Sequence, residues 1–159
     1  LPVALWLVRQ VCQALDVLQQ SGWTHGDVKP ANVMIAENGH ATLIDFAFAH
    51  RGTLIAGSPF EGTPDFAAPE VVVNPAARTP ASDVFAAGRM LWEWLTRVET
   101  QDEAVLAPVC ELVESMVAED ASHRPSAGAV VKELLRLEID TLGEHIIPSA
   151  PQPIASRAA

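Results

Sequence analysis

The chain of 159 residues has few basic side chains, and only two of them are lysines, Lys29 and Lys132. The 20 acidic residues outnumber the 10 arginines and lysines, which gives a formal net charge of -10. A surface that grips nucleic acid or anionic lipid broadly needs positive charge, so we expect neither as a partner. Hydrophobic residues make up 49% of the chain, which is enough for a buried core and excludes a wholly disordered protein.

Cysteine and long apolar segments are also scarce. Cys12 and Cys110 belong to no CxxC motif and to no Cys–His pair, so we expect free thiols and a reducing, cytoplasmic location. The apolar run at residues 1–8 ends at Arg9, which is too soon to span a membrane. It also lacks the basic start and the cleavage site of a signal peptide. Because there is no initiating Met, we expect the chain to begin within a longer protein.

Hydrophobic periodicity predicts a mainly α-helical chain with a small β-hairpin. Apolar side chains recur at spacings of three and four over residues 1–20, which is typical of a helix with one buried face. Two short apolar runs flank Asn38-Gly39, a strong hairpin signal, and predict strands at 33–35 and 41–44. Glycines and prolines at 51–67 indicate an extended loop, in which we expect Arg51 and the preceding His50 to be solvated.

The sequence that follows this loop predicts four helices and a tail. Ser82 or Asp83 is a suitable cap for the second of these helices, and Ser126 for the last. From residue 140 the chain is rich in proline and alanine, so we expect a folded domain over 1–139 and a disordered tail over 140–159. The predicted helices cover residues 69–73, 82–96, 106–118 and 126–137.

The side chains that could take part in a reaction or bind a metal ion gather around this hairpin. Asp27, Lys29 and Asn32 lie on one loop before it, and Asp45 follows it, so the hairpin should return Asp45 to the neighbourhood of Asn32. Amide and carboxylate oxygens suit Mg²⁺, which keeps waters and phosphate oxygens as its other ligands. Lys29 can neutralise a transferring phosphoryl group, and Asp27 can orient a hydroxyl and accept its proton. Such a set is typical of phosphoryl transfer.

At these positions the sequence resembles eukaryotic-type protein kinases. Residues 25–32 read H-G-D-V-K-P-A-N, similar to the family's H-R-D-x-K-P-x-x-N, and residues 45–47 read D-F-A, similar to D-F-G. The stretch 62–70 resembles the end of an activation segment closing on A-P-E. Residues 82–88 and 123–126 resemble two further segments of the kinase family, and they follow in the same order as in that family. The resemblance covers residues 23 to about 137 and implies the α+β large lobe of a kinase.

The resemblance implies catalytic roles for four residues. Asp27 would be the catalytic base, and Lys29 would contact the γ-phosphate of ATP, which favours Ser/Thr over Tyr acceptors on a protein substrate. Asn32 would take part through the Mg²⁺ that it holds, and Thr63 would help shape the acceptor site.

Nucleotide binding is implied for a second set, which Lys29 and Asn32 share. Asp45 would bind Mg²⁺ together with Asn32. Met34 would lie under the adenine, with Ile44 close by, and both are also expected to be core residues.

The remaining implied roles are structural. His25 and Phe46 would stack between the lobes, and Asp83 would brace the backbone of the catalytic loop. An ion pair between Glu70 and Arg124 would hold the end of the activation segment.

Several family features are absent. No GxGxxG occurs among the nine glycines, and with Lys29 in the catalytic loop and Lys132 in the last predicted helix, no lysine is left for the family's phosphate-binding strand. We therefore expect a large lobe without the N-terminal β lobe, inactive by itself, with that lobe elsewhere in the parent protein. In addition, Gly26 stands where many members carry Arg, and Ala47 replaces a glycine.

Two other functions remain open beside a Ser/Thr protein kinase. The missing features also suit a pseudokinase-like binding or scaffold module. Residues 25–27 and 44–46, H-G-D and I-D-F, are also similar to aminoglycoside or choline phosphotransferases, which act on small molecules. The lysine-proline pair at 29–30 and the A-P-E stretch at 68–70 favour the protein kinase.

Overall fold

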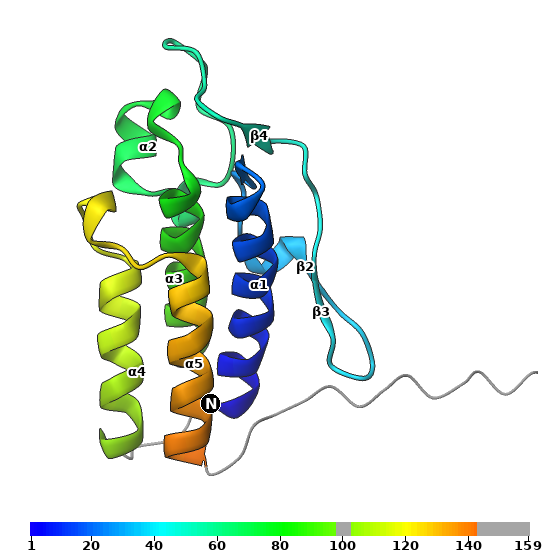
Figure 1. Ribbon diagram of the computed structural model, residues 1–159, viewed down its shortest axis with the longest axis vertical. Coiled ribbons are helices and arrows are strands. Elements are labelled where there is room, and N and C mark those ends of the chain that lie inside the picture. The colour runs from blue at the N-terminus through cyan, green and yellow to red at the C-terminus, as the bar shows by residue number, and fades with distance from the viewer. Residues whose placement is uncertain (98–102, 143–159) are drawn as a thin grey trace, which may run out of the picture.

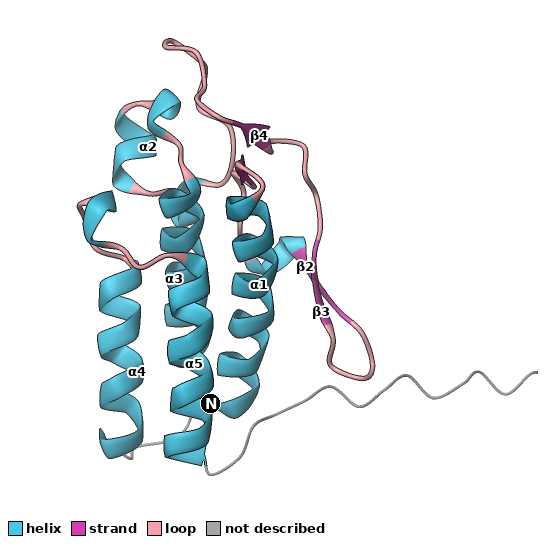
Figure 2. Ribbon diagram, in the orientation of Figure 1, coloured by secondary structure: helices cyan, strands magenta, loops and turns pink. Residues whose placement is uncertain are grey.

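The computed structural model describes residues 1–97 and 103–142, without the side chains of residues 141 and 142. Figures 1 and 2 show long helices running side by side, with a hairpin beside α1 and a short helix at one end. The chain is mainly helical with two small antiparallel sheets, of which the sequence predicts one. The elements are α1 (Pro2–Gln20), β1 (Trp23–Thr24), β2 (Val33–Ile35), β3 (Ala41–Leu43), β4 (His50–Arg51), α2 (Pro69–Val73), α3 (Pro80–Leu95), α4 (Glu103–Met116) and α5 (Ala127–Leu142).

The core lies where α1 packs on α3 and α5, with α4 closing the other side of α3 and α5. The apolar face predicted for the first helix is the face that is buried. A buried ion pair also joins the two ends of the described chain, since Arg9 Nε contacts Glu138 Oε1 at 2.8 Å. Fully buried side chains from all four helices fill the core, among them Leu5, Val8, Val11, Met90, Leu91, Val109, Met116 and Leu134.

The predicted hairpin is confirmed. β2 pairs with β3 in antiparallel register, with Met34 opposite Thr42. The turn requires a glycine at position 39 because its φ is +81° and because an added Cβ would lie 2.1 Å from the Trp6 ring. Turn chemistry and helix packing thus agree at one residue, which fixes how the hairpin lies against α1.

A second small sheet was not predicted. β1 pairs with β4, with Trp23 opposite Arg51 and Thr24 opposite His50. Strands of two residues carry no alternation that a sequence pattern could reveal. The expectation that His50 is solvated is therefore wrong, since its ring nitrogens are buried and have no hydrogen-bond partner among the described residues. Arg51 is exposed, but it belongs to a strand and not to a loop.

The limits of three helices differ from those predicted. The N-cap of α3 is Thr79, whose N–H donates to Ser82 Oγ at 3.0 Å, so the predicted caps lie inside the helix. α4 begins three residues earlier than predicted and tolerates Pro108 within it. Ser126 does cap α5, because its Oγ accepts from the N–H of Ala129 at 3.2 Å.

α5 continues to residue 142, so the predicted domain boundary at 139/140 falls inside this helix. The rest of the predicted tail, 143–159, lies outside the described residues. Across the described ranges, no helix combines the length and the apolar character that a membrane span requires. Cys12 and Cys110 are both free thiols, as predicted.

Candidate active site

The backbone of the loop at residues 25–32 is hydrogen-bonded to a buried carboxylate on α3. Asp83 accepts hydrogen bonds from the backbone N–H groups of His25 at 2.7 Å and Gly26 at 2.9 Å. Burial raises the pKa of Asp83 to about 6, although these two N–H groups and the charge of Arg78 act in the opposite direction. Asp83 thus braces the loop backbone as the sequence predicts.

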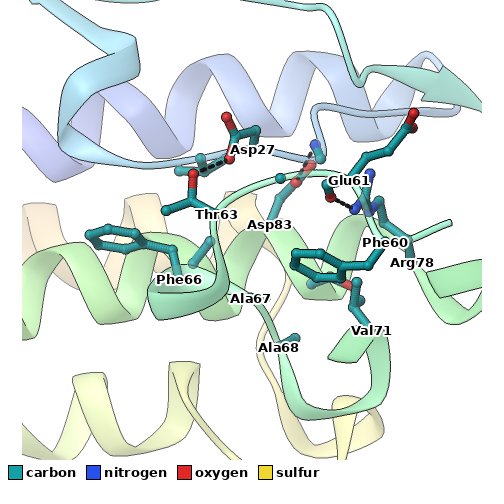
Figure 3. Close-up of a pocket in the computed structure, with 15 residues that line it drawn as sticks. Asp27, Phe60, Glu61, Thr63, Phe66, Ala67, Ala68, Val71, Arg78 and Asp83 are labelled. Carbon is teal, nitrogen blue, oxygen red and sulfur yellow. Dashed lines mark hydrogen bonds between the residues drawn. The ribbon is translucent and has the colours of Figure 1, made fainter. Parts of the chain in front are cut away.

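Four of the predicted side chains meet above this brace. Thr63 Oγ1 donates to Asp27 Oδ1 at 2.8 Å (Figure 3). Lys29 Nζ lies 2.7 Å from Asp27 Oδ2. Lys29 Nζ also donates to Thr63 Oγ1 at 2.7 Å, and the amide of Asn32 donates to Asp27 Oδ2 at 3.1 Å. Residues 36 positions apart in the sequence therefore form one hydrogen-bonded cluster around a single carboxylate.

This cluster keeps Asp27 ionised. Burial by itself would raise the pKa of Asp27, but hydrogen bonds from Lys29 and Thr63, the charge of Lys29 and the amide of Asn32 outweigh it. The net effect places the pKa of Asp27 below its usual range. A carboxylate of this kind is acceptor-only near neutral pH, so it can receive a hydrogen bond from an incoming hydroxyl.

The hairpin brings Asp45 back toward Asn32, as predicted. Ile44 N–H donates to the Asn32 carbonyl at 2.9 Å, so the residue after Ile44 lies beside the catalytic loop. Asp45 has a left-handed backbone, with φ 62°, and its Oδ1 accepts from Ala47 N–H at 3.3 Å. Among the described residues no three His, Cys, Asp or Glu side chains gather as a metal cluster.

The side of the loop at which the sequence predicts nucleotide binding, called the nucleotide side below, exposes apolar surface. The side chains of Met34, Ile35 and Phe46 are 62%, 54% and 50% exposed, whereas Ile44 is partly buried. The expectation that Met34 is a core residue is therefore wrong. Phe46 packs edge-on against the ring of His25, with 4.8 Å between centroids.

His25 is wholly buried, and both of its ring nitrogens form hydrogen bonds with backbone groups. Its Nδ1 accepts from Asp27 N–H at 3.3 Å, which leaves Nε2–H to donate to the Ile44 carbonyl at 3.1 Å. Burial lowers the pKa of His25, so the ring is neutral near pH 7. The imidazole thereby links the catalytic loop to the end of β3.

The side of the loop at which the sequence predicts the acceptor site, called the acceptor side below, contains an ion pair that the sequence also predicts. Arg124 binds Glu70 through two hydrogen bonds of 2.8 Å each, and Glu70 also accepts from Ser82 Oγ at 3.1 Å. Burial would raise the pKa of Glu70, but the contacts with Arg124 outweigh it and lower the pKa. The stretch that ends at Glu70 is thereby fixed to α3 and to the loop before α5.

Sequence reasoning missed Arg78. This residue follows the turn Pro75–Ala77, and its Nη2 donates to the carbonyl of Glu61 (Figure 3). It lines a small pocket beside Asp27 with apolar side chains, among them Phe60, Phe66 and Val71. No motif marks an arginine at this position, so only its burial in the folded chain reveals it.

The chain is similar to known kinases over most of its length. A model of the family described as the protein kinase domain matches residues 3–105. A probable serine/threonine-protein kinase of Bifidobacterium longum is 30% identical over 80% of this chain and 21% of its own length. A serine/threonine-protein kinase of Mycobacterium tuberculosis is 32% identical over 77% of this chain and 13% of its own length. The cGMP-dependent protein kinase, isozyme 1, of Drosophila melanogaster is 36% identical over 58% of this chain and 12% of its own.

Proposed function

Since the chain belongs to the protein kinase family, we propose that it forms the large-lobe half of a serine/threonine kinase active site. The reaction would transfer the γ-phosphate of ATP to a hydroxyl of a protein substrate. The chain spans between 12% and 21% of the length of the relatives described above, so this activity is proposed for the whole protein. The observation that carries the proposal is the cluster of Lys29, Asn32 and Thr63 around Asp27.

The cluster is arranged to receive one more hydrogen-bond donor. An ionised carboxylate offers about four lone-pair sites, and Thr63, Lys29 and Asn32 supply three donors to Asp27. The acceptor hydroxyl would take the remaining site and transfer its proton to Asp27 as the phosphoryl group arrives. Because Lys29 bonds both Asp27 and Thr63, a small rotation would turn its ammonium toward the γ-phosphate without removing it from the cluster.

Asn32 and Asp45 would hold Mg²⁺ at the phosphates. The amide NH₂ of Asn32 is bound to Asp27, which leaves its side-chain oxygen as the natural ligand atom. One amide oxygen and one carboxylate fit Mg²⁺, which usually binds few protein groups and keeps waters and substrate phosphates. The ion, when bound, supplies neutralisation of the phosphate charge.

Met34 and Ile44 would support the adenine from one side only. Met34 and Phe46 are 62% and 50% exposed, so their apolar side chains are open to contact with a flat ring. Lys132 lies in α5 and lines a groove against α1, so it is no candidate for the missing phosphate-binding lysine. We therefore assign the glycine-rich loop and this lysine to residues outside the 159, and we expect the chain alone to be inactive.

The test measures transfer of ³²P from ATP to a protein or peptide by the full-length protein, whatever precedes and follows residues 1–159. Asp27→Asn should lower kcat by about 10³-fold, which is within the range for loss of a general base. Glu37→Gln, an exposed carboxylate in the hairpin loop, is the matched control and should retain wild-type activity.

Three results would contradict the proposal. Undiminished phosphate transfer by Asp27→Asn would show that Asp27 is not the catalytic base. Binding of Mg-ATP without turnover would favour a pseudokinase-like module. Phosphorylation of a free sugar or amine, but of no peptide, would favour a small-molecule phosphotransferase.

A further inference from the structure

The space beside Gly26 is filled by a side chain from a distant part of the sequence. Gly26 has a φ of +85°, and an added Cβ would lie 2.8 Å from the carbonyl oxygen of Phe48 and 3.0 Å from Arg78 Nη1. Few residues other than glycine adopt this backbone conformation, and no larger residue would fit without displacing the guanidinium. The glycine in the catalytic loop and Arg78 are therefore complementary in shape.

Arg78 contacts three segments from its buried position. The residue is 4% exposed. Its Nη2 donates to the backbone carbonyl of Glu61, its Nη1 lies against Gly26, and its charge acts on Asp83 at the base of the loop. A guanidinium remains charged at any relevant pH and carries five N–H donors in a planar fork, which suits bridging of this kind.

The charge balance around Arg78 shows why it stays buried. A buried cation is costly unless an anion or several acceptors accompany it. Asp83 supplies the negative charge, and the Glu61 carbonyl accepts a hydrogen bond. Because these partners belong to α3 and to the activation segment, compensation of the charge requires both segments to be in place.

The contact at Glu61 lies next to the residues that meet Asp27. A Cβ on Gly62 would lie 3.2 Å from the Gly26 carbonyl oxygen and 3.5 Å from Asp27 Oδ1, so the backbone here lies flat on the catalytic loop. Thr63, the next residue, donates to Asp27. Holding the carbonyl of Glu61 thus limits the freedom of Gly62 and Thr63 directly above the candidate base.

We infer that Arg78 is a positioning residue that fastens the activation segment to the catalytic loop and so keeps Thr63 on Asp27. The guanidinium acts through the Glu61 backbone and touches none of the reacting groups. The structural part of this inference stands on the contacts alone, and its kinetic part rests on the proposed function.

Limited proteolysis tests the structural part without an activity assay. Cleavage by a glutamate-specific protease after the exposed Glu61 requires the segment to leave the loop, whereas cleavage after the exposed Glu37 reports the separate hairpin loop. In the full-length protein, Arg78→Gln should raise the ratio of cleavage at Glu61 to cleavage at Glu37 by about tenfold, because it removes a hydrogen bond from a charged donor. Arg97→Gln removes an exposed charge elsewhere and should leave the ratio unchanged.

Arg78→Lys keeps the inference testable if Arg78→Gln does not fold. Lysine preserves the charge toward Asp83 but lacks the fork, so the cleavage ratio should lie between those of the wild type and Arg78→Gln. An unchanged ratio in either folded variant, with native circular dichroism, would overturn the inference.

Kinetics then separate positioning from general destabilisation. Arg78→Gln should raise KM for an acceptor peptide by about tenfold and KM for ATP clearly less, since the segment bonds Asp27 directly but reaches the proposed phosphate site only through Lys29. Arg78→Lys should recover part of this loss. Equal effects on both KM values would contradict a positioning role. If the wild type transfers no phosphate, the proposed function fails, and the proteolysis alone decides whether Arg78 fastens the segment.

Discussion

The two sides of the catalytic loop are built in different ways. On the acceptor side, buried polar groups from distant segments bind one another, as in the pairs Asp83–Gly26 and Glu70–Arg124. On the nucleotide side, the hairpin leaves apolar side chains in water, with Met34 and Ile35 more than half exposed. On the acceptor side these polar groups find partners within the described residues, whereas on the nucleotide side the described residues leave Met34 and Ile35 uncovered.

This difference shows on which side of the loop the buried polar groups find their partners within these residues. Buried hydrogen bonds and ion pairs depend on exact partners, so their presence on the acceptor side means that all partners are supplied by these residues. Exposed apolar side chains gain little from folding and gain more when another surface covers them. Substitutions on the two sides should accordingly act on different properties: stability on the acceptor side and ligand affinity on the nucleotide side.

The largest effect on stability is expected at the ion pair that closes the acceptor side. The side chain of Arg124 is fully buried, and Arg124→Ala would leave Glu70 without its cation. Breaking a buried pair by removing one partner costs about 3–5 kcal/mol. Chemical denaturation of the protein should show this decrease in the free energy of unfolding.

The double substitution Arg124→Ala with Glu70→Ala is the control for this pair. It should cost clearly less than the sum of the two single substitutions, because no charge is left uncompensated. Additive losses would mean that the pair is not coupled and that the acceptor side is held by packing alone.

A somewhat smaller effect, dependent on pH, is expected at Asp83. Because burial raises its pKa to about 6, the folded protein binds a proton more tightly than the unfolded chain does. The contribution of Asp83 to stability is therefore fully present below about pH 4 and is lost as the pH rises through about 6. A shift of this size corresponds to about 3 kcal/mol.

Asp83→Asn isolates this contribution, since asparagine stays neutral. The difference in unfolding free energy between wild type and variant should move by about 3 kcal/mol in favour of the variant between pH 4 and pH 7. Urea titrations at several pH values would measure it. A difference that does not vary with pH would show that the carboxylate is not perturbed by burial.

The smallest effect on stability is expected on the nucleotide side. Met34→Ala removes an exposed side chain, so the free energy of unfolding should change by less than about 0.5 kcal/mol. In the full-length protein, KM for ATP should nevertheless rise by about threefold to tenfold, because the substitution removes apolar contact with the adenine.

Thr42→Ala, on the facing strand of the same hairpin, is the matched control and should leave KM for ATP unchanged. A loss of stability with unchanged affinity for ATP would reverse the comparison of the two sides.

Much of the fold could be predicted because its signals are local. The periodicity of α1, the Asn38-Gly39 turn and the Ser126 cap each depend on residues that are neighbours in sequence. The features that were missed depend on long-range packing. The pairing of Thr24 with His50 joins strands too short for a pattern, and the exposure of Met34 depends on how the hairpin lies on α1.

In the candidate site, too, some features depend on local sequence and others on long-range packing. The residue types and spacing at 25–32 and 45–47 were sufficient to select the candidate side chains, since groups on one loop keep their order whatever surrounds them. Their catalytic roles remain predictions. The tertiary structure alone decided that Thr63 and Lys29 share the carboxylate of Asp27, and that Arg78 fastens the segment above it. Apart from the Lys29–Asp27 pair, these contacts join residues 17 to 52 positions apart. Their distances cannot be inferred from a sequence pattern, because only burial of apolar and charged groups in the folded chain brings such segments together.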